Sequence, residues 1–143
     1  MSDNADIRLV IGDWPTLRHD ATAIRHEVFV IEQDVPVELE LDGMDAASLH
    51  VVAYQGEHAV GTARLLPDGH IGRMAVKREY RSTGIGSRLL LALMKTAKAR
   101  GDRFVRLNAQ RQAEAFYARH GYVQEGEEFL DAGIPHIAMR CML

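Results

Sequence analysis

The segment of residues 73–88 joins the end of an apolar strand to a basic turn and then to a turn with two glycines that opens a long helix. Gly84 and Gly86 lack a Cβ, so the backbone at these positions can come close to a ligand. A helix N-terminus carries unpaired N–H groups and a partial positive charge, and both favour the binding of phosphates. The segment therefore predicts that a phosphate-bearing ligand binds where the strand leads into the helix.

Spacing distinguishes this segment from two other glycine-rich phosphate motifs. A P-loop requires Gly-x4-Gly-Lys-Ser/Thr, and no lysine here is placed to reach terminal phosphates. A dinucleotide fingerprint requires a third glycine where this chain has Leu89, and an acid at the end of the next strand, which here ends in Asn108. The pair Gly84-x-Gly86 is by itself also compatible with an ordinary turn. An ATP or dinucleotide site is therefore disfavoured.

Two ordered motifs resemble those of the GNAT superfamily of N-acetyltransferases. The first is Arg81-x-x-Gly84-x-Gly86, between an apolar strand end and an apolar helix, and it is similar to the family's acetyl-coenzyme A motif. The second spans residues 107–122 and is similar to the family's strand followed by a helix that carries Phe-Tyr and ends in Gly-aromatic. Three further segments resemble the small bacterial ElaA-like branch of the family: residues 24–33, 38–42 and 133–136.

The resemblance covers nearly the whole chain and implies one GNAT-like domain over residues 1–143. The implied fold is α/β, a mixed and mostly antiparallel sheet flanked by helices, and the implied co-substrate is acetyl-CoA. In the family, backbone N–H groups of the fourth strand contact the thioester and the pantetheine, which maps to Met74, Ala75 and Val76. The pyrophosphate turn maps to Arg81, Ser82, Thr83, Gly84, Ile85, Gly86 and Ser87.

Composition narrows the class of protein further. A chain of 143 residues is long enough for one core, and a net charge of −3 at pH 7 argues against a general nucleic-acid binder. One cysteine excludes an internal disulfide, no apolar run approaches membrane-spanning length, and the polar residues 1–6 do not resemble a signal peptide. We expect a cytoplasmic protein without nucleic-acid or membrane partners, and the family resemblance leaves homodimer formation open.

Apolar periodicity and turn residues predict the order of the elements. Strands are expected at about residues 7–11, 50–54, 59–66, 70–76, 104–108, from 122 onward and at 134–142. Helices are expected after an N-cap at Thr16, fading near residues 28–31, then from Ile85 to a C-cap at Gly101, and over residues 112–120, with residues 32–49 irregular. Ligands of such sheets collect at the carboxyl ends of strands, where Val76 and Asn108 lie.

Acetyl transfer from a thioester to an amine requires a donor for the oxyanion, a neutral amine and a proton for the departing thiolate. Backbone donors such as those of residues 74–76 typically contribute a few kcal/mol. Tyr117 matches the helix tyrosine that relatives place beside the sulfur, and a phenol of pKa ~10 is protonated at neutral pH. Asn108 has the donors and acceptor that suit the pantetheine amides. The alternative role of Tyr117 is that of a core aromatic residue, and the alternative role of Asn108 is to cap a loop.

The acceptor amine poses a separate problem. An alkylamine of pKa ~10.4 is neutral in only about one molecule in 2,500 at pH 7, so a base is useful. Between Arg25 and Arg64 the chain has eight acids and no lysine or arginine. Alternation within residues 38–42 would place three carboxylates on one side of an extended stretch, which would attract a cationic amine. Glu40 and Asp42 are therefore the first candidates, and a solvated acidic loop is the alternative.

Two histidines are further candidates for the base. His50 opens a strand beside the acidic segment, and His136 lies in the Gly-Ile-Pro-His segment that resembles the ElaA-like branch. Either is also compatible with a hydrogen-bonded structural role. No HExxH or Cys-x-x-Cys spacing is present, so no metal is expected.

Cys141 and His136 differ by five positions and face opposite ways on a regular strand, which disfavours an acyl-enzyme formed by a Cys–His pair. We therefore expect direct transfer, in a ternary complex, to a small-molecule or peptide amine. The alternative is a non-catalytic coenzyme A-binding module used for sensing or assembly.

Overall fold

The computed structural model describes residues 6–143, and its elements alternate between hairpins and helical connections. In chain order they are β1 (Ile7–Gly12), α1 (Trp14–Arg25), a π-helical segment (His26–Glu32), α2 (Val37–Glu40), a 3-10 turn (Asp45–Ala47), β2 (Leu49–Gln55), β3 (His58–Leu65), β4 (Ile71–Val76), a 3-10 turn (Arg78–Tyr80), α3 (Ile85–Ala99), β5 (Phe104–Gln110), a 3-10 turn (Arg111–Ala113), α4 (Glu114–Arg119), β6 (Val123–Gln124), β7 (Phe129–Asp131) and β8 (Ile134–Met142). Residues 1–5, which carry most of the prediction about a signal peptide, lie outside the described residues.

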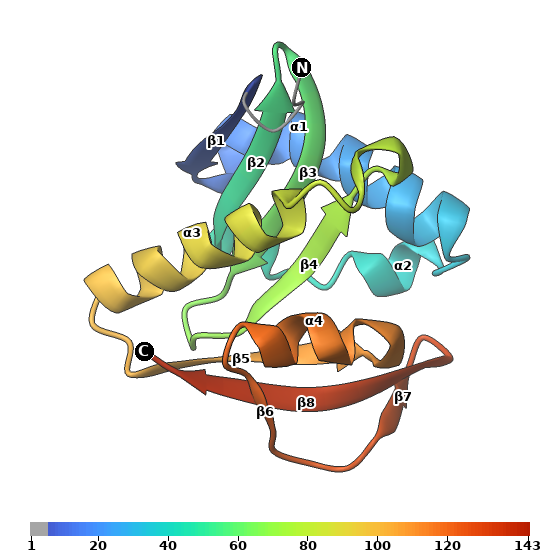
Figure 1. Ribbon diagram of the computed structural model, residues 1–143. Helices are drawn as coiled ribbons and strands as arrows, with labels where there is room; N and C mark the ends of the chain where they lie inside the picture. Colours follow the sequence, from blue (N-terminus) through green and yellow to red (C-terminus); the bar gives the residue numbers. More distant parts are fainter. Residues whose placement is uncertain (1–5) are drawn as a thin grey trace.

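The strands form two antiparallel sheets that are joined at one end. The first has the order β1–β2–β3–β4 and the second β5–β8–β6, with β7 also pairing with β8. An isolated parallel bridge between His70 and Arg106 links the start of β4 to β5. Figure 1 shows β4 and β5 diverging from this end, with the first sheet above and the second below. The predicted mostly antiparallel α/β fold is confirmed, although the sheet is divided.

Helices cover both faces of the first sheet (Figure 1). The predicted stripe of α3 is buried, at Ile85, Leu89, Leu93 and Ala97. A Cβ on Gly61 of β3 would lie 3.1 Å from Leu89 and 3.2 Å from Ile85, so this glycine lets α3 lie close to the sheet. On the opposite face α1 packs against the sheet, and α4 covers the second sheet on the same side as α3. No helix of residues 6–143 is long and apolar enough to cross a membrane.

The N-terminal helix differs from its prediction at both ends. Its N-cap is Asp13, whose carboxylate accepts from the Thr16 N–H at 3.0 Å, so the expected N-cap at Thr16 is wrong by three residues. The helix does not fade near residue 28 but continues in π-helical form to Glu32.

Two further elements were also placed differently by the sequence. Residues 37–40 are helical where an extended stretch was expected, and α4 proper begins at Glu114 after a 3-10 turn. The short strand β7 was not predicted. It lies at the rim of the second sheet and pairs with β8 over three residues, which is too little apolar periodicity to detect.

A bulge interrupts the pairing of β4 with β3 at the centre of the fold. The pairs Thr62–Ala75 and Arg64–Gly72 leave two residues of β4, Arg73 and Met74, opposite one residue of β3. Arg73 has a φ of 49°, in the left-handed region that non-glycine residues seldom adopt. Bulges leave an extra residue outside the ladder and redirect the neighbouring side chains. The bulge of this protein lies on β4, the strand that borders the space between the two sheets.

Candidate active site

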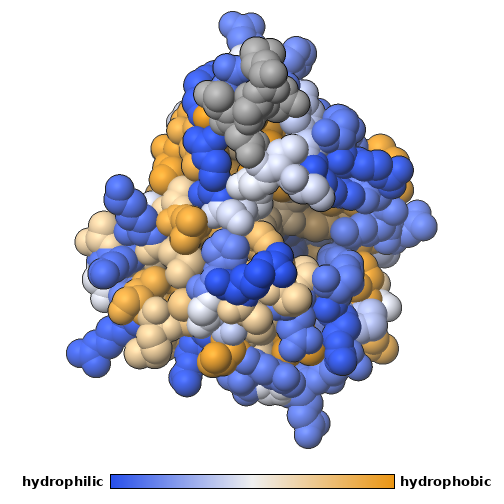
Figure 2. All heavy atoms as spheres, viewed as in Figure 1, coloured by the Kyte–Doolittle hydropathy of each residue, from blue (hydrophilic) through white to orange (hydrophobic). Residues whose placement is uncertain are grey.

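A cleft of about 1010 Å³ opens between the diverging ends of β4 and β5. Residues of both sheets, of α3 and α4, and of the segment after α1 line it. Figure 2 shows a recess with an apolar floor right of centre, surrounded by polar side chains. The carboxyl ends of β4 and β5, where the sequence placed the ligand site, therefore do border a cavity.

Side-chain alternation divides this cleft into two sides. Leu107 of β5 belongs to the core that includes α3, so Asn108 and Gln110 point to the opposite face. Gln110 there donates from Nε2 to Oε1 of Gln33, at 2.9 Å, across the cleft. We call the side lined by Gly86, Phe116 and Tyr117 the α3/α4 side, and the side lined by Gln33, Leu39 and Gln110 the α2 side.

The glycine turn lies on the α3/α4 side. Gly84 is the N-cap of α3 with a φ of 88°, no side chain caps this helix, and its first turn has no acid. A Cβ on Gly86 would lie 3.5 Å from the ring of Phe116, so a larger side chain would close the space between α3 and α4. The predicted turn residues border the cleft, apart from Thr83, whose hydroxyl donates to the Tyr80 carbonyl at 2.6 Å.

The Arg81 side chain braces this turn. Its Nη atoms bind both carboxylate oxygens of Glu32, at 2.6 and 2.7 Å, and its Nε donates to the Val76 carbonyl at 2.9 Å. The Arg81 hydrogen bonds lower the pKa of Glu32, so the pair stays charged at neutral pH. Arg81 thus ties the turn to the end of β4, and its guanidinium is paired with protein groups.

Tyr117 lies where β4 faces α4. Its hydroxyl donates to the sulfur of Met74 at 3.7 Å, and its ring packs edge-on against Phe116 and Tyr122. Burial raises the pKa of Tyr117 to about 12, so the phenol is protonated at neutral pH. The hydroxyl therefore lies beside the cleft, next to β4.

The three strand residues predicted to contact the thioester differ in where their side chains point. Met74 and Val76 line the cleft, whereas Ala75 is buried against the α1 face. Asn108 is exposed to the cleft, and its amide has no side-chain hydrogen-bond partner among residues 6–143. Its donors and acceptor are therefore available to a ligand.

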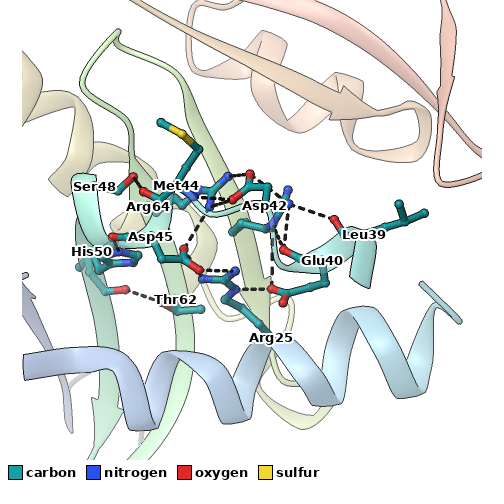
Figure 3. A network of polar contacts seen from close by, with 12 residues as sticks. Arg25, Leu39, Glu40, Asp42, Met44, Asp45, Ser48, His50, Thr62 and Arg64 are labelled. Carbon is teal, nitrogen blue, oxygen red and sulfur yellow. Dashed lines mark hydrogen bonds and ion pairs between the residues drawn. The ribbon is translucent and has the colours of Figure 1, made fainter. Parts of the chain in front are cut away.

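The acidic segment differs most from its prediction. Arg25 binds Glu40 and, at 2.8 Å from Nη1, Asp45. Arg64 binds Asp42 and, at 3.0 Å, Asp45. Arg73, a residue that the sequence did not single out, adds contacts to Asp42 at 3.3 Å and to the Glu40 carbonyl at 3.0 and 3.1 Å. Figure 3 shows the labelled members of this group, Arg25, Glu40, Asp42, Asp45 and Arg64, converging between α1, α2 and the first sheet. We call these six side chains, Arg25, Glu40, Asp42, Asp45, Arg64 and Arg73, the arginine–carboxylate network.

The open acidic surface predicted for Glu40 and Asp42 is therefore wrong. Residues 37–40 form a helix, so the carboxylates do not alternate along a strand, and each is paired with arginine. The Arg64 hydrogen bonds hold the pKa of Asp42 far below its usual range, which makes this carboxylate a poor proton acceptor. The arginines come from outside the acidic stretch or from its two ends, so the local sequence could not show the pairing.

The two histidine candidates differ in their position relative to the cleft. His50 is buried outside the cleft, its Nε2 donates to the Asp45 carbonyl at 2.9 Å, and its ring lies 4.7 Å from that of Trp14. Burial lowers the pKa of His50, and the base predicted there is wrong because the ring does not reach the cleft. His136 does line the cleft, stacked on Phe129 with ring centroids 5.9 Å apart.

Neither a metal site nor an activated thiol is found among residues 6–143. Within residues 6–143 no group of three or more His, Cys, Asp or Glu side chains is placed to hold a metal ion. The Cys141 thiol contacts the His120 carbonyl at 3.8 Å, and Cys141 and His136 alternate to opposite faces of β8, as predicted. Burial raises the pKa of Cys141, so the thiol is not activated as a nucleophile.

Comparison with known proteins agrees with this geometry. The family described as "Acetyltransferase (GNAT) domain" matches residues 17–143. An N-acetyltransferase of Bacillus subtilis named YjcF, itself uncharacterized, is 47% identical over 124 residues, which cover 84% of this chain and 89% of that protein. A putative N-acetyltransferase from Lactobacillus plantarum superposes with a TM-score of 0.89 at 27% identity, covering 96% of this chain and 98% of the other. Escherichia coli ElaA gives a TM-score of 0.85 at 26% identity, covering 94% and 99%. The chain belongs to the GNAT acetyltransferase family and is an acyltransferase.

Proposed function

We propose that this acyltransferase uses acetyl-CoA as co-substrate and transfers the acetyl group directly to an amine in a ternary complex. The observation that carries the proposal is the cleft between β4 and β5, which extends from the uncapped N-terminus of α3 past Tyr117 to the α2 side. Such a cleft can hold a long thioester at one end and admit an amine at the other.

The residues of the α3/α4 side fit coenzyme A. The unpaired N–H groups at the start of α3, with no acid nearby, suit a pyrophosphate. Across the cleft, on the α2 side, the exposed Asn108 suits the pantetheine amides, and the bulge at Arg73 and Met74 turns part of the β4 backbone toward the cleft. A GNAT acetyltransferase from Elizabethkingia anophelis, which has the same fold with a TM-score of 0.72 at 16% identity, has been solved with acetyl-CoA bound.

The chemistry needs few protein groups. When bound, the thioester supplies the activated acetyl group. Backbone N–H groups of β4 near Met74 would stabilise the negative charge that develops on the carbonyl oxygen. Tyr117 would give its proton to the departing sulfur, and loss of that proton in Tyr117→Phe should lower kcat roughly ten- to a thousandfold while leaving the affinity for acetyl-CoA unchanged.

Two measurements test the proposal. Acetyl-CoA should raise the melting temperature, since it binds the folded state, whereas ATP and NAD should not. Thiol release should then appear with at least one amine from a panel of spermidine, tryptamine, glucosamine and a lysine peptide. A thermal shift without thiol release for a wide panel would favour the non-catalytic coenzyme A-binding module instead, and no shift with acetyl-CoA would overturn the proposal.

A further inference from the structure

We infer that His136 is the general base, and that its Nε2 takes the proton of the acceptor amine on the α2 side of the cleft. This inference rests on the proposed function, because it names the group that makes the amine nucleophilic. Four observations support it: the hydrogen bond of the ring, the side of the sheet on which it lies, the pairing of the other candidates, and the charges nearby.

The hydrogen bond fixes the tautomer of the ring. His136 Nδ1 lies 2.7 Å from the carbonyl oxygen of Ile134. A carbonyl oxygen only accepts, so Nδ1 carries the proton and, in the neutral ring, Nε2 has the free lone pair. Nε2 has no hydrogen-bond partner among residues 6–143, and the residue lines the cleft. The atom that could accept a proton is thus the one not used by the protein.

The strand register places this ring on the side where an amine would enter. His136 is paired with Gln110 of β5, and directly opposed residues share one face of a sheet. Gln110 points to the α2 side, where it binds Gln33. Tyr117 lies on the other side of the cleft beside Met74. A base on the amine and an acid on the sulfur would therefore approach the thioester from opposite sides of the cleft.

The other candidates are committed elsewhere. Glu40 and Asp42 neutralise arginines, and His50 uses its Nε2 as a donor outside the cleft.

The elements packed against His136 are β5, β7 and the 3-10 turn Arg111–Ala113. Near His136 these elements carry the carboxylate of Asp131 on β7 and the guanidinium of Arg111, which binds Glu128 at 2.8 Å. The Arg111 guanidinium is thus paired with a carboxylate.

The step balances without any further reactant. Nε2 takes one proton from the ammonium of the acceptor, and the Nδ1–H bond to the Ile134 carbonyl remains to stabilise the imidazolium. The freed lone pair forms the C–N bond, the C–S bond breaks, and the nitrogen of the new amide loses its second proton to water. The sulfur receives the proton of Tyr117, and both residues later exchange protons with water.

Two variants remove the base in different ways. Asn at position 136 can keep a donor near Nδ1 for the Ile134 carbonyl, whereas Gln places its amide near the position of Nε2, and neither is basic. With the best amine of the panel at pH 7, His136→Asn and His136→Gln should each lower kcat/KM about 100-fold or more. The loss should shrink as the pH rises toward the pKa of the amine, and for a fluorinated amine that is already neutral at pH 7.

His120 provides a matched control. Its Nδ1 also binds a backbone carbonyl, that of Phe116 at 3.0 Å, but it does not line the cleft. His120→Asn should keep the pH profile of the wild type. A loss in the His136 variants that is equal at every pH and for both kinds of amine would show a structural role and overturn the inference, as would wild-type kinetics.

The tautomer can be measured without any acceptor. A long-range ¹H–¹⁵N NMR spectrum of the imidazole rings, assigned by the loss of signals in His136→Asn, should show His136 protonated at Nδ1 with a bare Nε2. Protonation at Nε2 instead would overturn the inference even if acetyl transfer is observed. Conversely, absence of transfer with every amine would contradict the proposed function while leaving the tautomer result standing.

Discussion

The two charged regions that border the cleft differ in how their charge is balanced. At the start of α3, the N–H groups of the first turn face the cleft with no side-chain cap and no acid. In the arginine–carboxylate network, three arginines meet three carboxylates, and most of these side chains are buried. The first region can attract an anionic ligand, whereas the second is already neutral. The network therefore holds α2 against the bulge of β4 and does not supply a charged surface.

The difference predicts where mutations act. Changes in the network should affect folding before binding, because buried ion pairs leave an uncompensated charge when one partner is lost. Changes at the start of α3 should affect the binding of acetyl-CoA most.

The largest effect is expected for Arg25→Met. Arg25 is 2% exposed, and its loss leaves the buried Glu40 without its closest cation. We expect the free energy of unfolding, measured in urea, to fall by about 3–5 kcal/mol. The exposed pair of Arg111 and Glu128 is the control, and Arg111→Ala should cost no more than about 1 kcal/mol.

The double variant Arg25→Met/Glu40→Gln sharpens this test. It removes the cation and the carboxylate together, so part of the lost stability should return. If Arg25→Met were no more destabilising than Arg111→Ala, the network would not be the structural unit described here.

A second, smaller effect is expected at the glycine turn. Gly84→Val places a β-branched residue at a φ of 88°, which should cost about 1–3 kcal/mol of stability and remove the thermal shift with acetyl-CoA. Gly56 in the turn between β2 and β3 has a φ of 61° with nothing within 4 Å of a Cβ. Gly56→Val carries a similar backbone strain but should keep the full shift. Equal shifts in both variants would contradict the pyrophosphate site.

The same comparison explains which parts could be predicted from the sequence. The glycine turn and the apolar stripe of α3 are local patterns, since backbone geometry and helical period are set by neighbouring residues. The strands near residues 50–76 and 134–142 likewise show their alternation and turn residues in the chain itself. These features could be read without knowledge of the tertiary structure.

The network could not be predicted in this way. Arg25 binds a carboxylate fifteen positions away. Arg73 reaches α2 from a bulge in which its φ is 49°, and the sequence does not indicate this conformation. A run of acids without nearby lysine or arginine therefore suggested an open anionic surface, although the compensating cations arrive through the fold. The position of His136 across from Gln110 depends in the same way on register.

The smallest effect is expected for salt. Because the network is neutral, it should not steer a cationic amine toward the cleft. With acetyl-CoA saturating, kcat/KM for spermidine should therefore change by less than about twofold between 50 and 500 mM NaCl, a range over which the screening length shortens from more than 10 Å to a few ångströms. Arg73→Gln leaves three carboxylates with two arginines, so this variant should acquire a salt dependence that the wild type lacks, whatever its kcat. The slope against salt is the quantity to compare, because loss of Arg73 also loosens the bulge beside Met74. A steep decrease of kcat/KM with salt in the wild type, equal to that of Arg73→Gln, would show that the acidic segment attracts the amine despite its ion pairs.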